Sequence, residues 1–454
     1  MKSKIALALA GALLAATSAW AGEGEMVAVP NRPLTLKDCI SLALNESPAL
    51  EATRLDLTSV TEQARAAHAE LLPDITGRAS YQLFSGSPTN KFAVIDVGGG
   101  IGVGTGRNVD QGAVEIYSAH LAYPLFRDGS IFGLNTAPAE ASRLAKRRNL
   151  AWTAKLRREQ VIDRITNAYI ATVSAVNRAS YAERRVALLQ KQVDITEEQQ
   201  KQGLMLPIDL KLARSQLSGA KTLATILRQQ AVAGRIELAR ALGFENVSEL
   251  SLSNDLPEPP EPPSAEELLG PALNDHPSLQ AQKAMIDEAR ENYRLEQFRL
   301  YPSVTLEGSA VHIDDFSPSS AEVYLGSVNV NVPIFDFGAQ MSTTRARRAA
   351  YRAEKARLAA VKDDVTAEIV QIYQSIYVLS QNILSLQDEV AKANRDVQVT
   401  SSQQQQGIAA PLTAIEKELQ LISKRDNLDG LEVRRLMLYA DLQKAAGGAW
   451  KWIQ

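Results

Sequence analysis

The chain has little of the chemistry that catalytic and metal sites require. It contains one cysteine, Cys39, and four histidines among 454 residues, and a single cysteine excludes an internal disulfide. No two of the histidines have the i, i+4 spacing of helical metal ligands. Carboxylates are plentiful, but none converges with a histidine, serine or metal motif. We therefore expect no catalytic residue, no cofactor and no bound metal, and the chain is not predicted to be an enzyme.

Long hydrophobic runs are also missing. The run from Ile5 to Ala16 follows two lysines and precedes Ala19-Trp20-Ala21, and it is shorter than the ~18 apolar residues of a membrane helix. This arrangement is typical of a secretory signal peptide, which we assign to residues 1–21. Without its two lysines, the 49 Lys and Arg fall to 47 against 52 Asp and Glu. This acidic balance argues against nucleic acid as a partner.

Glycine and proline are absent from two unusually long stretches. Residues 136–202 contain no glycine and no proline after Pro138, residues 340–406 contain neither, and the stretches end at Gly203 and Gly407. At ~1.5 Å per residue, each stretch predicts a helix of roughly 100 Å. Each is followed by a further helical segment of about 35 residues, so we predict long helical hairpins at residues 136–242 and 340–446.

The two hairpins belong to a duplication of most of the chain. Thr35, Asp38 and Pro48 match Ser264, Glu267 and Pro277 at an offset of 229, the segment 123–129 matches 332–338 at 209, and Gly203 and Gly243 match Gly407 and Gly447 at 204. Thr35 with Asp38, and Ser264 with Glu267, predict capping boxes at two helix starts. We expect repeats at residues 22–250 and 264–448, a proline-rich linker at 251–263 and a C-terminal end at 449–454.

Between the helices the hydrophobic period changes from 3.6 to 2, which predicts strands. One pair of strands is expected at 73–84 and 114–124, and its counterpart at 303–313 and 322–333. Each has about the length of a strand that crosses an outer membrane with small polar residues facing a lumen. The alternative is a half-buried soluble hairpin. Four strands do not close a barrel, and lipid does not tolerate an open edge, so a membrane barrel would need several chains.

The turns that close the two hairpins are mostly apolar. They lie at the tips of the ~100 Å arms, beyond any core of the same chain, and exposed apolar tips are typical of a partner site. The candidate contact residues are Gly203, Leu204, Met205, Leu206 and Pro207 in one tip and Gly407, Ile408, Ala409, Ala410 and Pro411 in the other.

Two acidic residues, Asp209 and Glu416, follow the tips by about one helical turn. In an assembly of several copies they would ring a narrow lumen at its periplasmic entrance and favour cations. The alternative is that they stabilise the helix starts through the helix dipole.

The order and doubling of these motifs resembles the TolC-type outer-membrane efflux proteins, over nearly the whole mature chain. The motifs are the duplicated helix openings, the Pro-x-Phe-x-x-Gly strand exits, the Gly-x-x-x-Pro tips and the closing Gly447-Gly448-Ala449-Trp450. The resemblance implies a mainly α fold with transmembrane β-strands. It implies a homotrimer in which twelve strands form one β-barrel in the outer-membrane lipid, continuous with a periplasmic α-helical barrel.

The resemblance also implies a function. The protein would be the passive exit duct of a tripartite efflux pump or a type I secretion system. Its tips would contact a periplasmic adaptor protein and, through the adaptor, an inner-membrane pump. The competing hypothesis is a soluble periplasmic coiled-coil scaffold that never enters a membrane.

Two features depart from the family pattern. Members often have an aromatic residue three positions before the tip glycine, where this chain has Gln200 and Gln404. TolC-like members have two aspartates six and nine positions after the second tip glycine, where this chain has Thr413 and Glu416. The resemblance therefore predicts that half of the acidic entrance constriction is retained.

Overall fold

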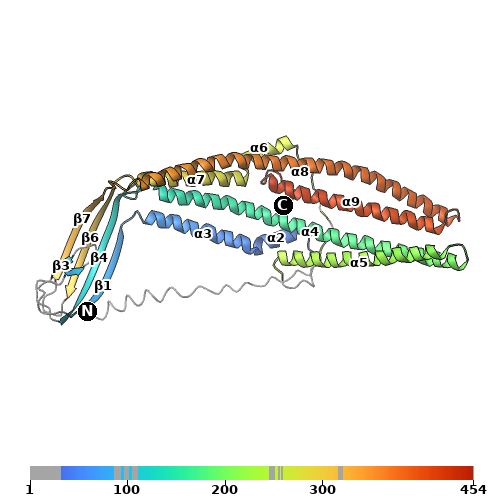
Figure 1. The fold of residues 1–454 in the computed structure, drawn as a ribbon, viewed down its shortest axis with the longest axis horizontal. Coiled ribbons are helices and arrows are strands. Elements are labelled where there is room, and N and C mark those ends of the chain that lie inside the picture. The colour runs from blue at the N-terminus through green and yellow to red at the C-terminus, as the bar shows by residue number, and fades with distance from the viewer. Residues whose placement is uncertain are drawn as a thin grey trace.

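The molecule is long and narrow, with a β-sheet at one end and a layer of helices along the rest (Figure 1). This computed structural model describes residues 32–85, 94–96, 102–104, 111–244, 251–253, 256, 259–314 and 321–452. The predicted signal peptide, residues 1–21, lies outside the described residues. In the described part of the chain, no helix is both long enough and apolar enough to cross a membrane.

Two helices run almost the full length of the helical layer. Helix α4 (Pro138–Lys201) has 64 residues and helix α8 (Ala339–Gln405) has 67, as the absence of glycine and proline predicts. Both helices end before a glycine, Gly203 or Gly407, whose φ of +74° is left-handed. Glycine takes this conformation without the clash that a Cβ would produce, so the chain reverses there.

Shorter helices line each long one. Helices α2 (Leu36–Glu46), α3 (Pro48–Ala69) and α5 (Pro207–Ala241) pack on α4. Their counterparts in the second repeat are α6 (Ala265–Asp275), α7 (Pro277–Phe298) and α9 (Pro411–Ala445), which pack on α8. Both predicted capping boxes are confirmed: the Thr35 hydroxyl accepts from the Asp38 N–H, and the Ser264 hydroxyl accepts from the Glu267 N–H, each at 3.3 Å.

The sheet contains four long antiparallel strands in the order β1-β4-β6-β7. They are β1 (Asp74–Ser85), β4 (Gln111–Arg127), β6 (Ser303–Asp314) and β7 (Ala321–Asn331). The short strand β5 (Ser130–Ile131) pairs with β4, and β2 (Val94–Asp96) pairs with β3 (Gly102–Gly104) apart from the main sheet.

Most strand ends differ from the predicted ones by one to three residues, and proline accounts for two of these differences. Strand β7 stops at Asn331, before the predicted residue 333, because Pro333 has no N–H to donate to a ladder. Strand β4 continues through Pro124 to Arg127, past the predicted end at residue 124, because a bulge between Pro124 and Phe126 shifts the register there.

The core of each repeat lies near the middle of its long helix. In the first repeat, fully buried Cys39, Tyr169 and Leu238 pack together, and the Tyr169 hydroxyl donates to the Ser253 carbonyl at 2.7 Å. In the second, Leu268 occupies the position equivalent to Cys39 and packs on Ile369. Burial raises the pKa of the Cys39 thiol to about 12, so the thiol stays neutral and Cys39 serves as a small apolar core residue.

The repeats are joined by polar contacts between α4 and α9. The Lys444 ammonium lies 3.2 Å from an Asp163 carboxylate oxygen and 3.3 Å from one of Asp441. Burial raises the pKa of Asp163. Burial alone would lower the pKa of Lys444, but the carboxylates of Asp163 and Asp441 raise it above its ordinary value.

Substitution of Lys444 by Met is expected to destabilise this junction by about 1–3 kcal/mol, because Asp163 stays half-buried without its cation. The melting temperature in detergent should fall, and the double variant Lys444→Met/Asp163→Leu should recover most of the loss.

The contribution of Lys444 to the free energy of unfolding is complete below the ordinary lysine pKa of about 10.4, and it is lost as the pH rises through the higher folded pKa. An unchanged melting temperature in Lys444→Met would contradict this assignment.

Candidate membrane belt and periplasmic tips

One face of the sheet is apolar although this chain leaves it uncovered. In an antiparallel ladder directly paired residues lie on the same face, and the ladders place Ile75, Leu121, Gly308 and Gly326 in one row. Among the strand side chains that the structure describes, eight large apolar or aromatic ones are exposed, and all lie on this face: Ile75, Tyr81, Tyr117, Leu121, Leu306, Tyr324, Val328 and Val330. We call it the apolar face.

The opposite face carries most of the polar strand residues. It contains Thr76, Arg78, Ser80, Ser118, His120, Thr305, Glu307, Ser309, Ser327, Asn329 and Asn331. The large apolar residues with described side chains on this face, Ile116, Val311, Val323 and Leu325, lie toward the loop end of the strands. A sheet with one exposed apolar face and one polar face separates lipid from water.

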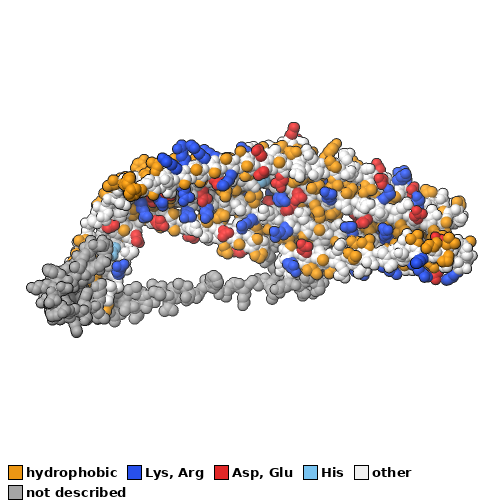
Figure 2. All heavy atoms as spheres, viewed as in Figure 1, with side chains coloured by type: hydrophobic (Ala, Val, Ile, Leu, Met, Phe, Trp, Pro, Cys, Tyr) orange, Lys and Arg blue, Asp and Glu red, His pale blue; other side chains and the backbone are white. Residues whose placement is uncertain are grey.

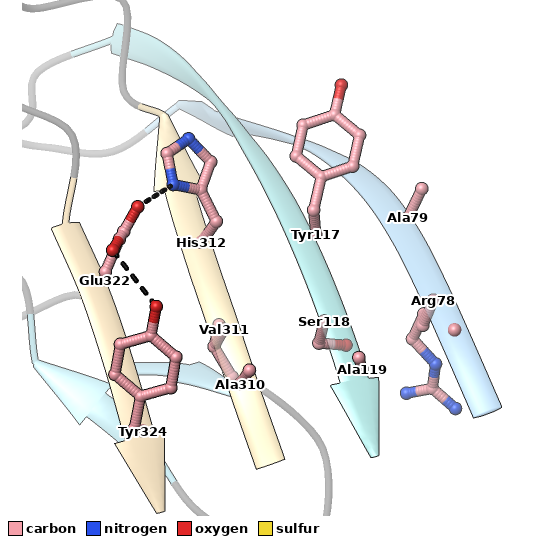
Figure 3. A pocket seen from close by; sticks show the side chains of 11 residues that line it. Arg78, Ala79, Tyr117, Ser118, Ala119, Ala310, Val311, His312, Glu322 and Tyr324 are labelled. Atoms are coloured by element: carbon pink, nitrogen blue, oxygen red, sulfur yellow. Dashed lines mark hydrogen bonds and ion pairs between the residues drawn. The ribbon is translucent and has the colours of Figure 1, made fainter. Parts of the chain in front are cut away.

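The apolar face is hollowed near the loop end of the strands. A groove of about 480 Å³ has small residues such as Gly77, Ala119 and Ala310 along it. Figure 3 shows that Tyr117, His312, Glu322 and Tyr324 stand around it. The Tyr324 hydroxyl donates to a Glu322 oxygen at 3.2 Å, and the other Glu322 oxygen lies 3.8 Å from His312 Nδ1. The polar tips of the tyrosines thus lie beside the charged residues that end the apolar face.

A second group of exposed apolar residues surrounds the junction between strands and helices. Figure 2 shows hydrophobic side chains gathered where the sheet meets the helical layer. The group consists of Leu72, Ile131, Phe132, Leu134, Leu300, Tyr301, Ile334, Phe335 and Phe337. Aromatic residues at such a boundary are typical of the interface between a membrane and water. We call this group the junction belt.

The backbone at the junction holds the aromatic rings outward. Phe337 has a φ of +52°, unusual for a bulky residue, and its side chain is 93% exposed. The Asp336 carboxylate stabilises the turn by accepting from the Gly338 and Gln340 N–H groups at 2.9 and 2.7 Å. The motif Pro-x-Phe-x-x-Gly can be recognised in the sequence. The hydrophobic periodicity around it does not indicate that these aromatic rings are exposed.

The two predicted tips have the same geometry. The Gly203 N–H donates to the Gln200 carbonyl and the Gly407 N–H to the Gln404 carbonyl, both at 3.0 Å. Leu204, Leu206 and Ile408 are exposed, and Met205 and Ala409 are partly buried. Pro207 and Pro411 each begin the next helix, after Leu206 and Ala410 as N-caps. Each tip therefore presents apolar side chains on a fixed turn.

The two candidate entrance acids have different surroundings in the structure. The Asp209 carboxylate accepts from the Leu206 N–H at 3.1 Å and so caps the start of α5. Glu416 is exposed and, together with Thr413, lines a cavity of about 660 Å³ between α4, α5 and α9. Arg185 of α4 also lines this cavity. Sequence reasoning missed Arg185, since nothing in the spacing distinguishes it from the other arginines of α4.

These features define a class of protein: an envelope subunit with a lipid-facing sheet and a long helical arm that ends in apolar tips. The family model described as outer membrane efflux protein matches residues 39–244 and 268–448. The chain belongs to this family. It is an outer-membrane efflux channel of the TolC family and not an enzyme, and channels of this family are trimers.

Individual relatives are distant in sequence and close in fold. The outer membrane protein TolC of Vibrio cholerae is 22% identical over 63% of this chain and 67% of its own length. The pyoverdine export outer membrane protein OpmQ of Pseudomonas aeruginosa is 21% identical over 63% of this chain and 61% of its own length. The crystal structure of the CmeC outer membrane channel of Campylobacter jejuni has a TM-score of 0.74 at 13% identity, over 96% of this chain and 92% of that one.

Substitution of Asp209 by Ala is expected to destabilise the first turn of α5 by about 1 kcal/mol, because the Leu206 N–H loses its acceptor. Hydrogen exchange measured by mass spectrometry should become faster in peptides that cover residues 204–212. Glu416→Ala is the matched control, since Glu416 caps no helix start, and it should leave exchange at both tips unchanged. Equal effects of the two substitutions would contradict the capping role.

Proposed function

We propose that three copies of this chain form a passive exit duct across the outer membrane, as one component of a tripartite efflux pump or a type I secretion system. The twelve strands of the trimer close a β-barrel with the apolar face in lipid. The helices continue it as a periplasmic α-helical barrel. The energy for transport comes from an inner-membrane partner.

The apolar face is the observation that carries this proposal. Within the described residues, β1 and β7 each pair on one side only, so two strand edges of 12 and 11 residues are open. An open edge inside lipid leaves N–H and C=O groups without partners, at several kcal/mol for each group. Sister subunits supply the missing pairs and close the ring.

The apolar face also separates the duct from the scaffold hypothesis. A soluble scaffold would expose eight large apolar strand residues and the junction belt to water. Large continuous apolar patches of this kind are rare on soluble monomers and mark interaction or membrane surfaces. The exposed apolar surface therefore favours the duct over the soluble scaffold.

The tips are the proposed docking site for a periplasmic adaptor. Leu204, Leu206 and Ile408 are exposed at the end of the molecule farthest from the sheet (Figure 1), where a partner from the inner membrane would meet the duct. Glu416 contributes one carboxylate from each subunit near this end, so three surround the proposed entrance and favour cations.

A matched pair of strand variants tests the proposed orientation. Val328→Arg places a charge on the apolar face and is expected to cost about 2–4 kcal/mol near the middle of the bilayer. It should lower the amount of trimer in the outer-membrane fraction. Ser327→Arg, one residue away on the opposite face, should leave trimer formation unchanged while altering single-channel conductance in planar bilayers.

The result that would overturn the duct is equal tolerance of both substitutions, together with recovery of the protein from the periplasm without detergent. That outcome would favour the soluble scaffold.

A second pair of variants tests the tips. Leu204→Ser and Ile408→Ser should weaken adaptor binding and reduce efflux in cells, because each removes an exposed apolar contact. The single-channel conductance of the purified trimer should stay at the wild-type value, since neither residue belongs to the proposed β-barrel. Lys201→Ser, an exposed change beside the first tip, is the control. Full efflux activity of the combined Leu204→Ser/Ile408→Ser variant would remove the tips as the docking site.

A further inference from the structure

The part of each long helix that follows the sheet is strongly basic. Residues 138–158 of α4 contain seven Lys or Arg and one Glu, and residues 339–357 of α8 contain six Lys or Arg and one Glu. The rest of α8, residues 358–405, contains three Lys or Arg and six Asp or Glu. The positive charge is therefore concentrated just beyond the junction belt, where Figure 2 shows Lys and Arg side chains gathered.

Three arginines of α8 form one stripe without an acidic partner. Arg345, Arg348 and Arg352 follow one another at i, i+3 and i+7, a spacing that places them on one face of the helix. All three are exposed, and no carboxylate of the described residues forms an ion pair with them. In contrast, the neighbouring Arg347 lies 3.9 Å from the buried carboxylate of Glu296. The charge of the stripe is available to a partner outside the chain.

The helix itself gives this stripe no stabilising role. Cations are favoured near the C-terminal end of a helix rather than near its N-terminal end, where the stripe lies. Arg345 with Arg348, and Arg348 with Arg352, are like charges at i, i+3 and i, i+4, and such pairs destabilise a helix. An anionic partner would relieve this repulsion.

The stripe lies on the outer side of the helical layer. Helix α2 forms a further layer on one side of α4, and this is the outer side because a narrow lumen has no room for it. Val173 of α4 is buried in the contact with α2. Arg148 precedes Val173 by 25 residues, about seven helical turns, and so lies on the same side of α4. Arg352 is the equivalent of Arg148 at the offset of 204 and therefore faces outward from α8.

The stripe also lies at the depth of lipid headgroups. Phe337 of the junction belt is 93% exposed and directly precedes α8, which begins at Ala339. Arg345 comes six residues after Ala339, about 9 Å along the helix at ~1.5 Å per residue. Helical side chains lean toward the N-terminus, which in α8 is the membrane end. The arginines thus extend toward the headgroups, which occupy roughly 5–8 Å on each side of a bilayer.

We propose that this stripe binds the phosphate groups of anionic phospholipids in the periplasmic leaflet of the outer membrane. The inference goes beyond the duct, and it rests on the proposed placement of the apolar face in lipid. Guanidinium groups bind phosphate through two parallel hydrogen bonds. Each Lys or Arg near an anionic membrane surface contributes roughly a fivefold gain in binding. The three stripes of a trimer would hold a ring of anionic lipid around the channel, next to the aromatic residues of the junction belt.

Neutralisation of the stripe tests the proposal. The variant Arg345→Gln/Arg348→Gln/Arg352→Gln keeps the polar, exposed character of the three side chains. The probe is a detergent solution with equal amounts of phosphatidylglycerol and phosphatidylethanolamine, and native mass spectrometry counts the lipids that stay on the trimer. The wild-type trimer should retain phosphatidylglycerol preferentially. The variant should bind phosphatidylglycerol roughly tenfold more weakly or worse, because three cationic contacts are lost, and its affinity for phosphatidylethanolamine should stay the same.

The matched control removes the same charge from the same helix farther from the membrane. Lys362→Gln/Lys392→Gln/Arg395→Gln also replaces three exposed cations of α8, and it should retain phosphatidylglycerol as the wild type does. Equal losses in the two variants would show a general charge effect and would overturn the proposal. Where the triple variant does not assemble, Arg345→Gln against Lys362→Gln makes the same comparison, with an expected loss of roughly fivefold.

Inorganic phosphate distinguishes a lipid site from a simple phosphate site. At matched ionic strength it should not displace phosphatidylglycerol from the wild-type trimer, because the acyl chains of the lipid also contact the junction belt. Displacement by inorganic phosphate would overturn the assignment of the stripe to lipid.

Ion selectivity in planar bilayers distinguishes the outer side from the lumen. Since the stripe faces outward, the triple variant should keep the wild-type conductance and reversal potential. A reversal potential shifted toward cation selectivity, with lipid binding unchanged, would place the arginines in the lumen and overturn the proposal while the duct stays in place. A wild-type chain that is monomeric by native mass spectrometry would overturn the duct itself.

Discussion

Backbone hydrogen bonding in lipid is the constraint on which the rest of this structure depends. A strand that crosses a bilayer must pair on both sides, because no water is present to satisfy its N–H and C=O groups. The four long strands of this chain form three strand pairs, so one edge of β1 and one edge of β7 have no partner strand in the described structure. A complete ring therefore requires other copies. Channels of this family are trimers, and three copies contribute six helical hairpins around one axis.

The long helices follow from that ring. Each connection between strands that leaves the membrane continues as a helix, and the helices must stay close together over ~100 Å without a globular core. They do so through small contact surfaces repeated along their length, such as the alanine and leucine contacts of α4 with α5 at Ala182, Ala224 and Leu227. Packing of an apolar stripe, rather than helix propensity alone, stabilises helices of this kind. The thicker cores around Tyr169 and Ile369 lie where the short helices α2 and α6 add a further layer.

Much of this architecture could be predicted from the sequence, because its signals are local or repeated. The helix ends depend on Gly203 and Gly407, and the capping boxes on Thr35 and Ser264, so each could be located from a few residues. The apolar face follows from period-2 alternation. The exposure of Phe337 could not be predicted, since it depends on a left-handed turn stabilised by Asp336. The cavity beside Glu416 could not be predicted either, because Arg185 meets it only through packing of α4 against α9.

Charged side chains connect the two repeats within the helical layer. The internal seam between α4 and α9 has a hydrogen bond from Tyr181 to Asp429 and an ion pair of Arg178 with Asp426. Hydrogen bonds to charged groups are roughly twice as strong as neutral ones. The two helical hairpins of one subunit are therefore held together by charged contacts as well as by apolar packing.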